Sequence, residues 1–426
     1  MTDETRAPRT SPWRFVPTLY FLQAIPYFLV DTTVTTFFAA IGVPVAEIGH
    51  AAGALKTPWT FKPLWSPLVD LFSTKRAWML GMQALLVLSA GALALAATSE
   101  DVVPWTLAAC AFMAVASATH DIAADGFYLL ALDEVDQAAF VGIRNTCYRL
   151  GRIFVAGGVV FLASALGDRG FAAARAWAYA FATSAAVLAL GLLACALLVP
   201  RPDRDCRRGV TAKSSPGLAL EAVSSYFARK DIGPILAFVM LYRFGESMLT
   251  TMSAPFLLKS IGEGGAGLSL RDLGIYSGTV GVAALLLGGI LGGYLISRRG
   301  LARWLWPMAL AMHLPNVLYA WAAFAHPGKL AIAGVVAIEQ LGYGFGFSAY
   351  MVVLMRISRG RGFDTTHYAI STGLMGLSAQ LASGVSGEIA ARLGFAGFFV
   401  VVCACAVPSL LPLFFLRVEE PPAQPT

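Results

Sequence analysis

Two acidic residues inside an otherwise apolar stretch are the first feature of this sequence suited to chemistry. Asp121 and Asp125 lie four residues apart within the segment 103–132, so on a helix they share one face. A carboxylate in an apolar helix costs a few kcal/mol unless it meets a polar cavity or a counter-ion. A carboxylate in such a position can couple proton binding to a change of conformation. We therefore expect Asp121 and Asp125 to be proton-coupling residues, with the deeper Asp121 as the proton site.

Basic residues in the next apolar segment complement these acids. Arg144 and Arg149 lie within 138–166, at depths similar to those of the two aspartates, and Tyr148 lies on the same face as Arg144. Two interpretations follow. Either buried ion pairs lock the two helices together, or one carboxylate titrates so that proton binding breaks a pair. The two arginines and Tyr148 are also candidates to bind substrate.

Other charged and aromatic residues in apolar segments extend this set of candidates. Arg243 and Glu246 are three residues apart, and they either neutralise each other or leave Arg243 to present its planar guanidinium to an anionic substrate. For Glu339, the closely spaced glycines that follow favour helix packing over a substrate role. The remaining substrate-binding candidates are Asp31 and Tyr27, expected to line a polar cavity, together with Lys62 and Trp59.

The scaffold that must position these residues is apolar. Of the 426 residues, 57% are hydrophobic and only 13% are charged, whereas a soluble chain carries roughly a quarter charged residues. Runs such as 181–199 and 398–416 contain no charge. About 20 apolar residues in a helix span the roughly 30 Å of a bilayer core. None of these runs alternates apolar and polar residues, as barrel strands do. The sequence predicts an all-α integral membrane protein.

Twelve transmembrane helices are expected, in two pseudo-symmetric six-helix bundles. The predicted spans are 14–40, 44–70, 77–98, 103–132, 138–166, 173–199, 233–259, 271–297, 302–325, 329–357, 364–391 and 395–417. Lys and Arg concentrate in the loops that are cytoplasmic if the N-terminus is inside, so both termini are expected in the cytoplasm.

The expected domains follow from these spans. They are a tail at 1–13, bundles at 14–199 and 233–417, a linker at 200–232 and a tail at 418–426. In the linker, Leu220, Val223 and Phe227 recur at helical spacing and predict an amphipathic helix.

A loop pattern repeated in both halves supports the two-bundle organisation. The pattern begins in the last turns of a span and runs into the loop. At the second span it comprises Ser66, Asp70, Lys75 and Arg76, and at the eighth it comprises Gly293, Ser297, Arg298 and Arg303, with similar spacing. The gating candidates are Asp70, Lys75, Arg76, Arg298 and Arg303. Parallel repeats of six spans are the architecture of the major facilitator superfamily, which the chain resembles. Ser297 replaces the acidic residue of that superfamily's loop motif.

Two further motifs resemble one branch of that superfamily, the muropeptide permeases of the AmpG type. They are Lys62-x-x-Trp65-Ser-Pro67-x-x-Asp70 and Asp121-Ile-Ala-Ala-Asp125-Gly. The branch also includes acetyl-CoA transporters and some siderophore importers. The resemblance implies proton-coupled import of a large polar solute such as a muropeptide, by a multi-pass protein of the bacterial inner membrane. The residue pattern by itself favours a polar, anionic solute without naming it.

An exporter, an enzyme and a non-transporting sensor are the alternatives to an importer. Proton-driven exporters of the superfamily often carry a Gly-Pro pair in the fifth span, whereas the stretch 154–160 has no proline. The sequence has no motif for a catalytic nucleophile, a metal or a phosphate-binding loop, so we expect no enzyme and no cofactor. A non-transporting sensor stays an alternative, because fold does not dictate activity. The expected partners are a small-molecule solute, protons and membrane lipid, with no nucleic acid, and the chain is expected to be a monomer.

Overall fold

The computed structural model describes residues 11–43, 54–202, 204–205, 215–360 and 362–416. Across these ranges the chain is helical, without a β-strand. Its contacts divide it into two compact units. Unit 1 comprises Met1–Leu132 and Thr146–Pro216, and unit 2 comprises Asp133–Asn145 and Gly217–Thr426.

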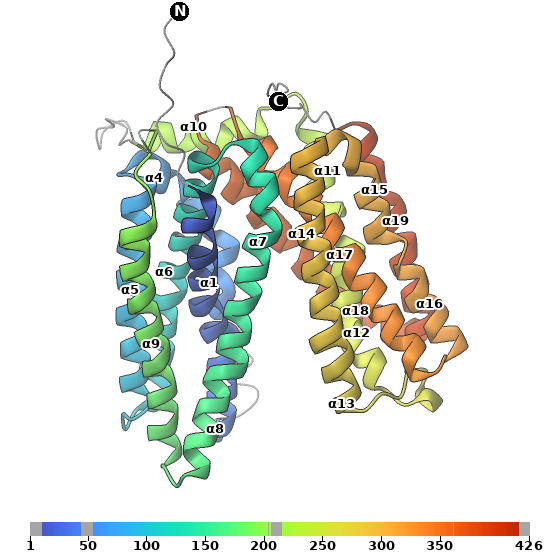
Figure 1. The fold of residues 1–426 in the computed structure, drawn as a ribbon, viewed down its shortest axis with the longest axis horizontal. Helices are drawn as coiled ribbons and strands as arrows, with labels where there is room; N and C mark the ends of the chain where they lie inside the picture. Colours follow the sequence, from blue (N-terminus) through green and yellow to red (C-terminus); the bar gives the residue numbers. More distant parts are fainter. Residues whose placement is uncertain (1–10, 44–53, 203, 206–214, 361, 417–426) are drawn as a thin grey trace, which may run out of the picture. The chain divides into compact units, whose positions relative to one another are not determined.

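The helices of unit 1 come mostly from the first half of the chain (Figure 1). They are α1 (Val16–Phe28), α2 (Val34–Ala40), α4 (Ser66–Leu71), α5 (Lys75–Ala96), α6 (Val102–Ala131), α8 (Val160–Asp168) and α9 (Ala173–Leu198), together with the second half of α7 (Glu134–Ile153). A π-helical segment, Leu29–Thr33, joins α1 to α2, and another, Phe154–Val159, joins α7 to α8. Helix α5 packs between α6 and α9, and α1 packs on α6.

Unit 2 contains the first half of α7 and the helices from α10 onward. These are α10 (Ser215–Phe227), α11 (Ile232–Leu241), α12 (Phe244–Leu258), α13 (Leu270–Leu273), α14 (Val282–Arg299), α15 (Leu301–His313), α16 (Asn316–Ala325), α17 (Lys329–Ser358), α18 (Asp364–Ala404) and α19 (Ala406–Leu410). Helix α17 packs against α14 and α15, and α18 packs against α12 and α16.

The helices confirm the predicted membrane protein. Within the described ranges, nine helical segments are long and apolar enough to cross a membrane. The longest, Asp364–Phe414, contains two predicted spans, and Gly394 interrupts it between them with a φ of 67°. Glycine adopts this left-handed conformation without steric cost, so the chain turns there. The first two predicted spans correspond to α1 with α2 and to broken helix within 54–71, while 44–53 lies outside the described residues.

The linker helix is present as α10, but its predicted apolar face is not the face that packs. Leu220 and Phe227 are exposed, whereas Ala222 and Tyr226 are buried. The Tyr226 hydroxyl lies 3.0 Å from Ser371 Oγ of α18. Helix α10 therefore docks on α18 through its smaller buried side and presents Leu220 and Phe227 outward, as a helix at a membrane surface would.

Glycines allow the helices of unit 2 to approach closely. A Cβ on Gly344 of α17 would lie 2.1 Å from the Leu285 carbonyl oxygen of α14, and one on Gly288 of α14 would lie 2.1 Å from the Leu341 oxygen of α17. Contacts of this length are impossible for real side chains, so this interface depends on the absence of a Cβ. Small residues at helix interfaces are the usual basis of close packing in membranes. The glycines after Glu339 thus have the packing role that was favoured for them.

We predict that Gly344→Ala lowers the melting temperature of the protein in detergent. The new methyl group would force α14 and α17 apart, at a cost of about 1–3 kcal/mol for overpacking. Gly334→Ala is the matched control, because it lies in the same helix with no atom within 4 Å of the added Cβ. Alanine is the better helix former, so the control should be at least as stable as the wild type. Equal melting temperatures for the two variants would contradict the role assigned to Gly344.

Candidate functional site

An ion pair inside unit 1 joins the two motifs that the sequence singled out. The Lys62 ammonium group, from the 3-10 turn Lys62–Leu64, contacts Asp121 Oδ2 of α6. The Gln23 amide of α1 donates a hydrogen bond to the other oxygen, Asp121 Oδ1. The Lys62 and Asp121 side chains are only 7% and 18% exposed. Both oxygens of Asp121 are thus held by donors from two other helical segments.

This geometry corrects one sequence-based interpretation. Asp121 was considered as a partner of an arginine in the next helix, because their depths matched. In the structure its partners are Lys62 and Gln23 instead. Matching depth does not fix which faces of two helices meet, and Lys62 reaches Asp121 from a different segment. The sequence predicted Gln23 to line a polar cavity with Tyr27 and Asp31, but not to bond to Asp121, although a buried amide in an apolar helix is itself a signal of a polar site.

Asp125 lies one helical turn further along α6 and is buried. The Tyr20 hydroxyl of α1 donates a hydrogen bond of 3.1 Å to Asp125 Oδ1. The Tyr20 ring packs edge-on against Tyr128, with 5.7 Å between ring centroids. The two aspartates therefore both face α1, as their spacing on one helix face predicted.

Aromatic side chains and a second ion pair lie on neighbouring turns of unit 1. The Tyr27 ring contacts Phe28 and Trp59 edge-on, with centroids 4.9 Å apart in both cases. Phe28 in turn contacts Tyr148 at 5.7 Å. Four residues after Tyr27, Asp31 forms an ion pair of 2.5 Å with the Lys56 ammonium group.

These ring contacts join the predicted residues Tyr27, Trp59 and Tyr148 through Phe28. The predicted residue Asp31 belongs to the ion pair with Lys56. Charge and aromatic surface together suit a polar solute that contains rings. Lys56 was not among the predicted site residues.

The first half of α7 is held within unit 2. Arg144 donates a hydrogen bond of 3.2 Å to the Tyr368 hydroxyl of α18. The Glu134 carboxylate lies 3.6 Å from Arg356 Nε and 3.3 Å from an Arg359 guanidinium nitrogen. Arg149, on the second half of α7, belongs to unit 1 and is partly buried.

Arg243 and Glu246 do not neutralise each other by direct contact. A guanidinium nitrogen of Arg243 lies 2.5 Å from the Tyr343 hydroxyl, and its Cζ is 4.7 Å from the Phe347 ring centroid. Glu246 instead accepts a hydrogen bond of 2.5 Å from the Asn316 amide. Each side chain bonds to a partner on another helix, and the two form no direct ion pair, although the charge of Arg243 is near enough to act on Glu246. Arg243 is held by aromatic side chains.

The repeated loop motif has different surroundings in its two copies. In the first, Lys75 Nζ lies 2.8 Å from Asp70 Oδ1 and 2.8 Å from the Val69 carbonyl oxygen. The adjacent Arg76 donates to the Ala196 and Val199 carbonyl oxygens at the end of α9. In the second copy, Arg298 and Arg303 are exposed and, within the described ranges, form no ion pair. Arg298 packs over the Tyr294 ring at 5.6 Å.

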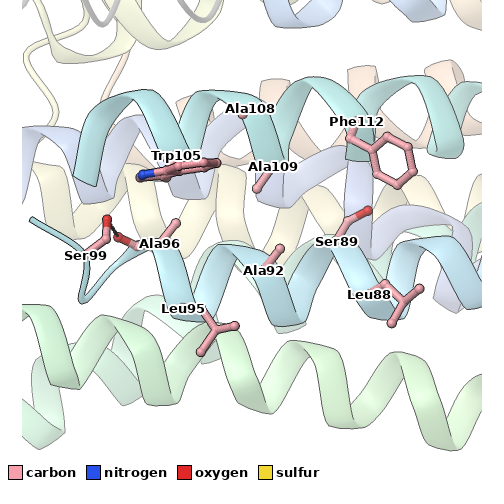
Figure 2. Close-up of a pocket in the computed structure, with 10 residues that line it drawn as sticks. All are labelled: Leu88, Ser89, Ala92, Leu95, Ala96, Ser99, Trp105, Ala108, Ala109 and Phe112. Atoms are coloured by element: carbon pink, nitrogen blue, oxygen red, sulfur yellow. Dashed lines mark hydrogen bonds between the residues drawn. The ribbon is translucent and has the colours of Figure 1, made fainter. Parts of the chain in front are cut away.

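A large cavity of unit 1 is not the polar site. A groove of 530 Å³ lies between α5 and α6, lined by apolar side chains such as Leu88, Leu95, Trp105 and Phe112 (Figure 2). Its hydroxyl groups, Ser89 of α5 and Ser99 just after that helix, donate hydrogen bonds to backbone carbonyl oxygens of α5. The groove therefore suits an acyl chain and offers no charged group to a polar solute. Among the described residues, no cluster of His, Cys, Asp and Glu could hold a metal ion.

Comparisons with known proteins agree with this architecture. Residues 18–366 match the Major Facilitator Superfamily. The anhydromuropeptide permease of Escherichia coli K12 is 26% identical over 404 residues, which cover 94% of this chain and 78% of the permease. The putative transporter AmpG 4 of Rickettsia felis is 23% identical over 93% of this chain and 94% of its own. The structure of the E. coli fucose:proton symporter FucP superimposes with a TM-score of 0.73 at 14% identity, covering 96% of this chain and 99% of that chain.

We predict that Lys62→Met destabilises the protein, because it leaves the Asp121 carboxylate buried without its cation. The expected loss is up to about 3 kcal/mol, measured as a lower melting temperature in detergent. The double variant Lys62→Met with Asp121→Leu should recover part of this loss, since no unpaired charge remains. Lys259→Met is the control, because Lys259 and Glu263 form an exposed ion pair, and such pairs contribute little. A Lys62→Met protein as stable as the wild type would refute the structural role of the pair.

Proposed function

The chain belongs to the major facilitator superfamily, and on that premise we propose that it imports a large polar, anionic solute together with protons by alternating access. The observation that carries this proposal is the buried pair between Lys62 and Asp121, with Gln23 on the second carboxylate oxygen. This pair joins a titratable acid to a cation able to hold an anionic group.

Proton binding and substrate binding are linked through that pair. A proton on Asp121 removes the negative charge that holds the Lys62 ammonium group. Lys62 is then left without a counter-ion in a site from which water is largely excluded, and an anionic group of the substrate supplies one. Loss of the proton restores the pair and releases the substrate. Asp125, bound by Tyr20, is the second proton-coupling candidate, because its carboxylate is buried on the same face of α6.

A muropeptide-like solute suits the remaining candidates. Such a molecule combines sugar rings with a carboxylated peptide. Tyr27, Trp59 and Tyr148 present aromatic rings for stacking on a sugar. Arg144, Arg149 and Arg243 provide guanidinium groups for carboxylates. The E. coli relative named an anhydromuropeptide permease supports this class of solute, and the likeness to a fucose:proton symporter supports coupling to protons.

The proposal also covers the location of the protein, its topology and its gating residues. The protein lies in a bacterial inner membrane with both termini in the cytoplasm, works as a monomer, and is built from bundles at 14–199 and 233–417 joined by the linker at 200–232. Asp70, Lys75 and Arg76 gate the first half, where Asp70 and Lys75 already form a buried pair. Arg298 and Arg303 gate the second half by exposed positive charge.

We predict that Asp121→Asn abolishes uptake driven by a pH gradient in reconstituted liposomes. Asparagine cannot release a proton, so the gradient no longer drives the cycle. Exchange of solute across vesicles without a gradient should persist, because the asparagine side chain resembles the protonated carboxyl group in size. Asp272→Asn is the control, since Asp272 precedes the membrane-crossing segment Gly274–Arg299 and pairs with Lys329. Full gradient-driven uptake by Asp121→Asn would remove the coupling role of Asp121.

The same assay identifies the solute and the direction. Anhydro-muropeptides, siderophores and CoA esters are offered in turn to vesicles of both orientations, with the gradient imposed either way. We expect uptake of an anhydro-muropeptide in the direction of proton entry. Flux that is indifferent to collapse of the gradient would refute proton coupling, and transport only out of the cytoplasm would refute import.

A further inference from the structure

Two fully buried carboxylates lie close together inside unit 2, far along the sequence from the Lys62 and Asp121 pair. Glu246 belongs to α12 and Glu339 to α17, and both are 0% exposed. They are near enough for their charges to interact. Asn316, the first residue of α16, and His313, the last of α15, complete the cluster. Four helices of one unit therefore converge on these groups.

Neither carboxylate has a lysine or arginine as a partner in the part of the chain that the structure describes. Glu246 Oε1 accepts from the Asn316 amide at 2.5 Å, and the Gln340 amide donates to the oxygens of Glu339 at 3.2 and 2.9 Å. Both donors are neutral amides. Arg243 lies near in sequence but is engaged by Tyr343. Within the described ranges, neither carboxylate therefore forms a direct ion pair with a basic side chain, although the charge of Arg243 is near enough to act on Glu246.

Several polar atoms around Glu246 are buried and lack hydrogen-bond partners among the described residues. They are Glu246 Oε2, Asn316 Oδ1 and both ring nitrogens of His313. The His313 Nδ1 atom lies 3.9 Å from Glu246 Oε1, which is too long for a hydrogen bond. A buried polar atom without a partner loses the hydrogen bonds that it would make with water. The cluster is thus rich in negative charge and unpartnered polar atoms, and within the described ranges no charged donor bonds to the Glu246 carboxylate.

We propose that Glu246 is a proton-binding site within unit 2, with the proton held on Oε2 and the neighbouring Glu339 ionised. One proton removes one of the two buried charges and converts an unpartnered acceptor into a donor. A metal ion is a poorer occupant, because the described residues contain no cluster suited to one and the Asn316 amide directs its hydrogens at Glu246. This site is separate from the Asp121 site of the proposed transport cycle and does not depend on it.

The other titratable or charged groups near Glu246 come from each helix packed around it. They are Glu339 of α17, His313 of α15, Tyr319 of α16, Cys403 of α18, and Tyr242 and Arg243 immediately before α12. Only Arg243 carries a permanent positive charge, and its guanidinium group is bound by aromatic rings. Among the described residues around Glu246, the one permanent cation therefore does not bond to its carboxylate.

Infrared spectroscopy of the purified protein in detergent tests the proposal without any transport measurement. Protonated carboxylic acids have a carbonyl stretching band that ionised ones lack. We expect this band in the wild type at neutral pH, and its loss in Glu246→Gln. Glutamine has the size of a protonated glutamate, so the variant should fold. Glu388→Gln is the matched control, because Glu388 is exposed and pairs with Arg392, and it should leave the band unchanged.

Three results would overturn the proposal. The first is a wild-type protein with no such band at neutral pH, a result that needs no variant. The second is a band that survives Glu246→Gln, including the case in which Glu339→Gln alone removes it. The third is a band that disappears when choline is replaced by sodium in the buffer, which would show that a metal cation takes the place of the proton.

Discussion

The cost of burying charge inside an apolar helix bundle is the constraint on which this structure depends. Ionisable side chains lie in several of the helices, and in unit 1 they meet partners on other segments. Lys62 holds Asp121, Lys56 holds Asp31, and Lys75 holds Asp70. The first two pairs link residues that are distant in sequence, and the third joins α4 to the start of α5, so the pairs connect different helical segments of the unit. Any step that adds a proton to one of these acids also loosens a contact between two segments.

The two units meet this constraint in different ways. In unit 1, lysines pair with Asp31, Asp70 and Asp121, whereas Glu246 and Glu339 of unit 2 accept hydrogen bonds from the amides of Asn316 and Gln340. Arg243 satisfies its positive charge with the faces of aromatic rings and the Tyr343 hydroxyl. The chemistry of unit 2 therefore differs from that of unit 1 even though the chain repeats its architecture. Similar spacing of spans does not imply equivalent sites.

Close helix packing is the second requirement, and it limits where charges are placed. In unit 2 the glycines of α14 and α17 remove side chains from the interface, so backbone meets backbone. Glu339 lies just before the glycine-rich part of α17. Its carboxylate is thereby brought into a packed interior from which water is excluded. A negative charge is costly in such an interior. The same short stretch of α17 therefore provides both the close contact with α14 and the buried carboxylate.

The sequence by itself determined the class of the protein. Apolar runs of the length of a bilayer, with no strand alternation, are sufficient to predict a helical membrane protein, and the paired motifs around Lys62 and Asp121 were sufficient to suggest its family. It also placed Asp121 and Asp125 on one face of a helix, because that follows from helical periodicity alone. Likewise, the break at Gly394 lies between two predicted spans.

Only the tertiary structure decided which side chains meet. Depth along the helices predicted an arginine as the partner of Asp121, but its partners in the structure are Lys62 and Gln23. Arg243 and Glu246 are three residues apart, yet each turns to a different helix. The reason is physical: periodicity gives the face and depth of a residue on its own helix, but the rotation and order of helices around it come from packing across the whole unit. A local pattern therefore predicts that a charge needs a partner without identifying that partner.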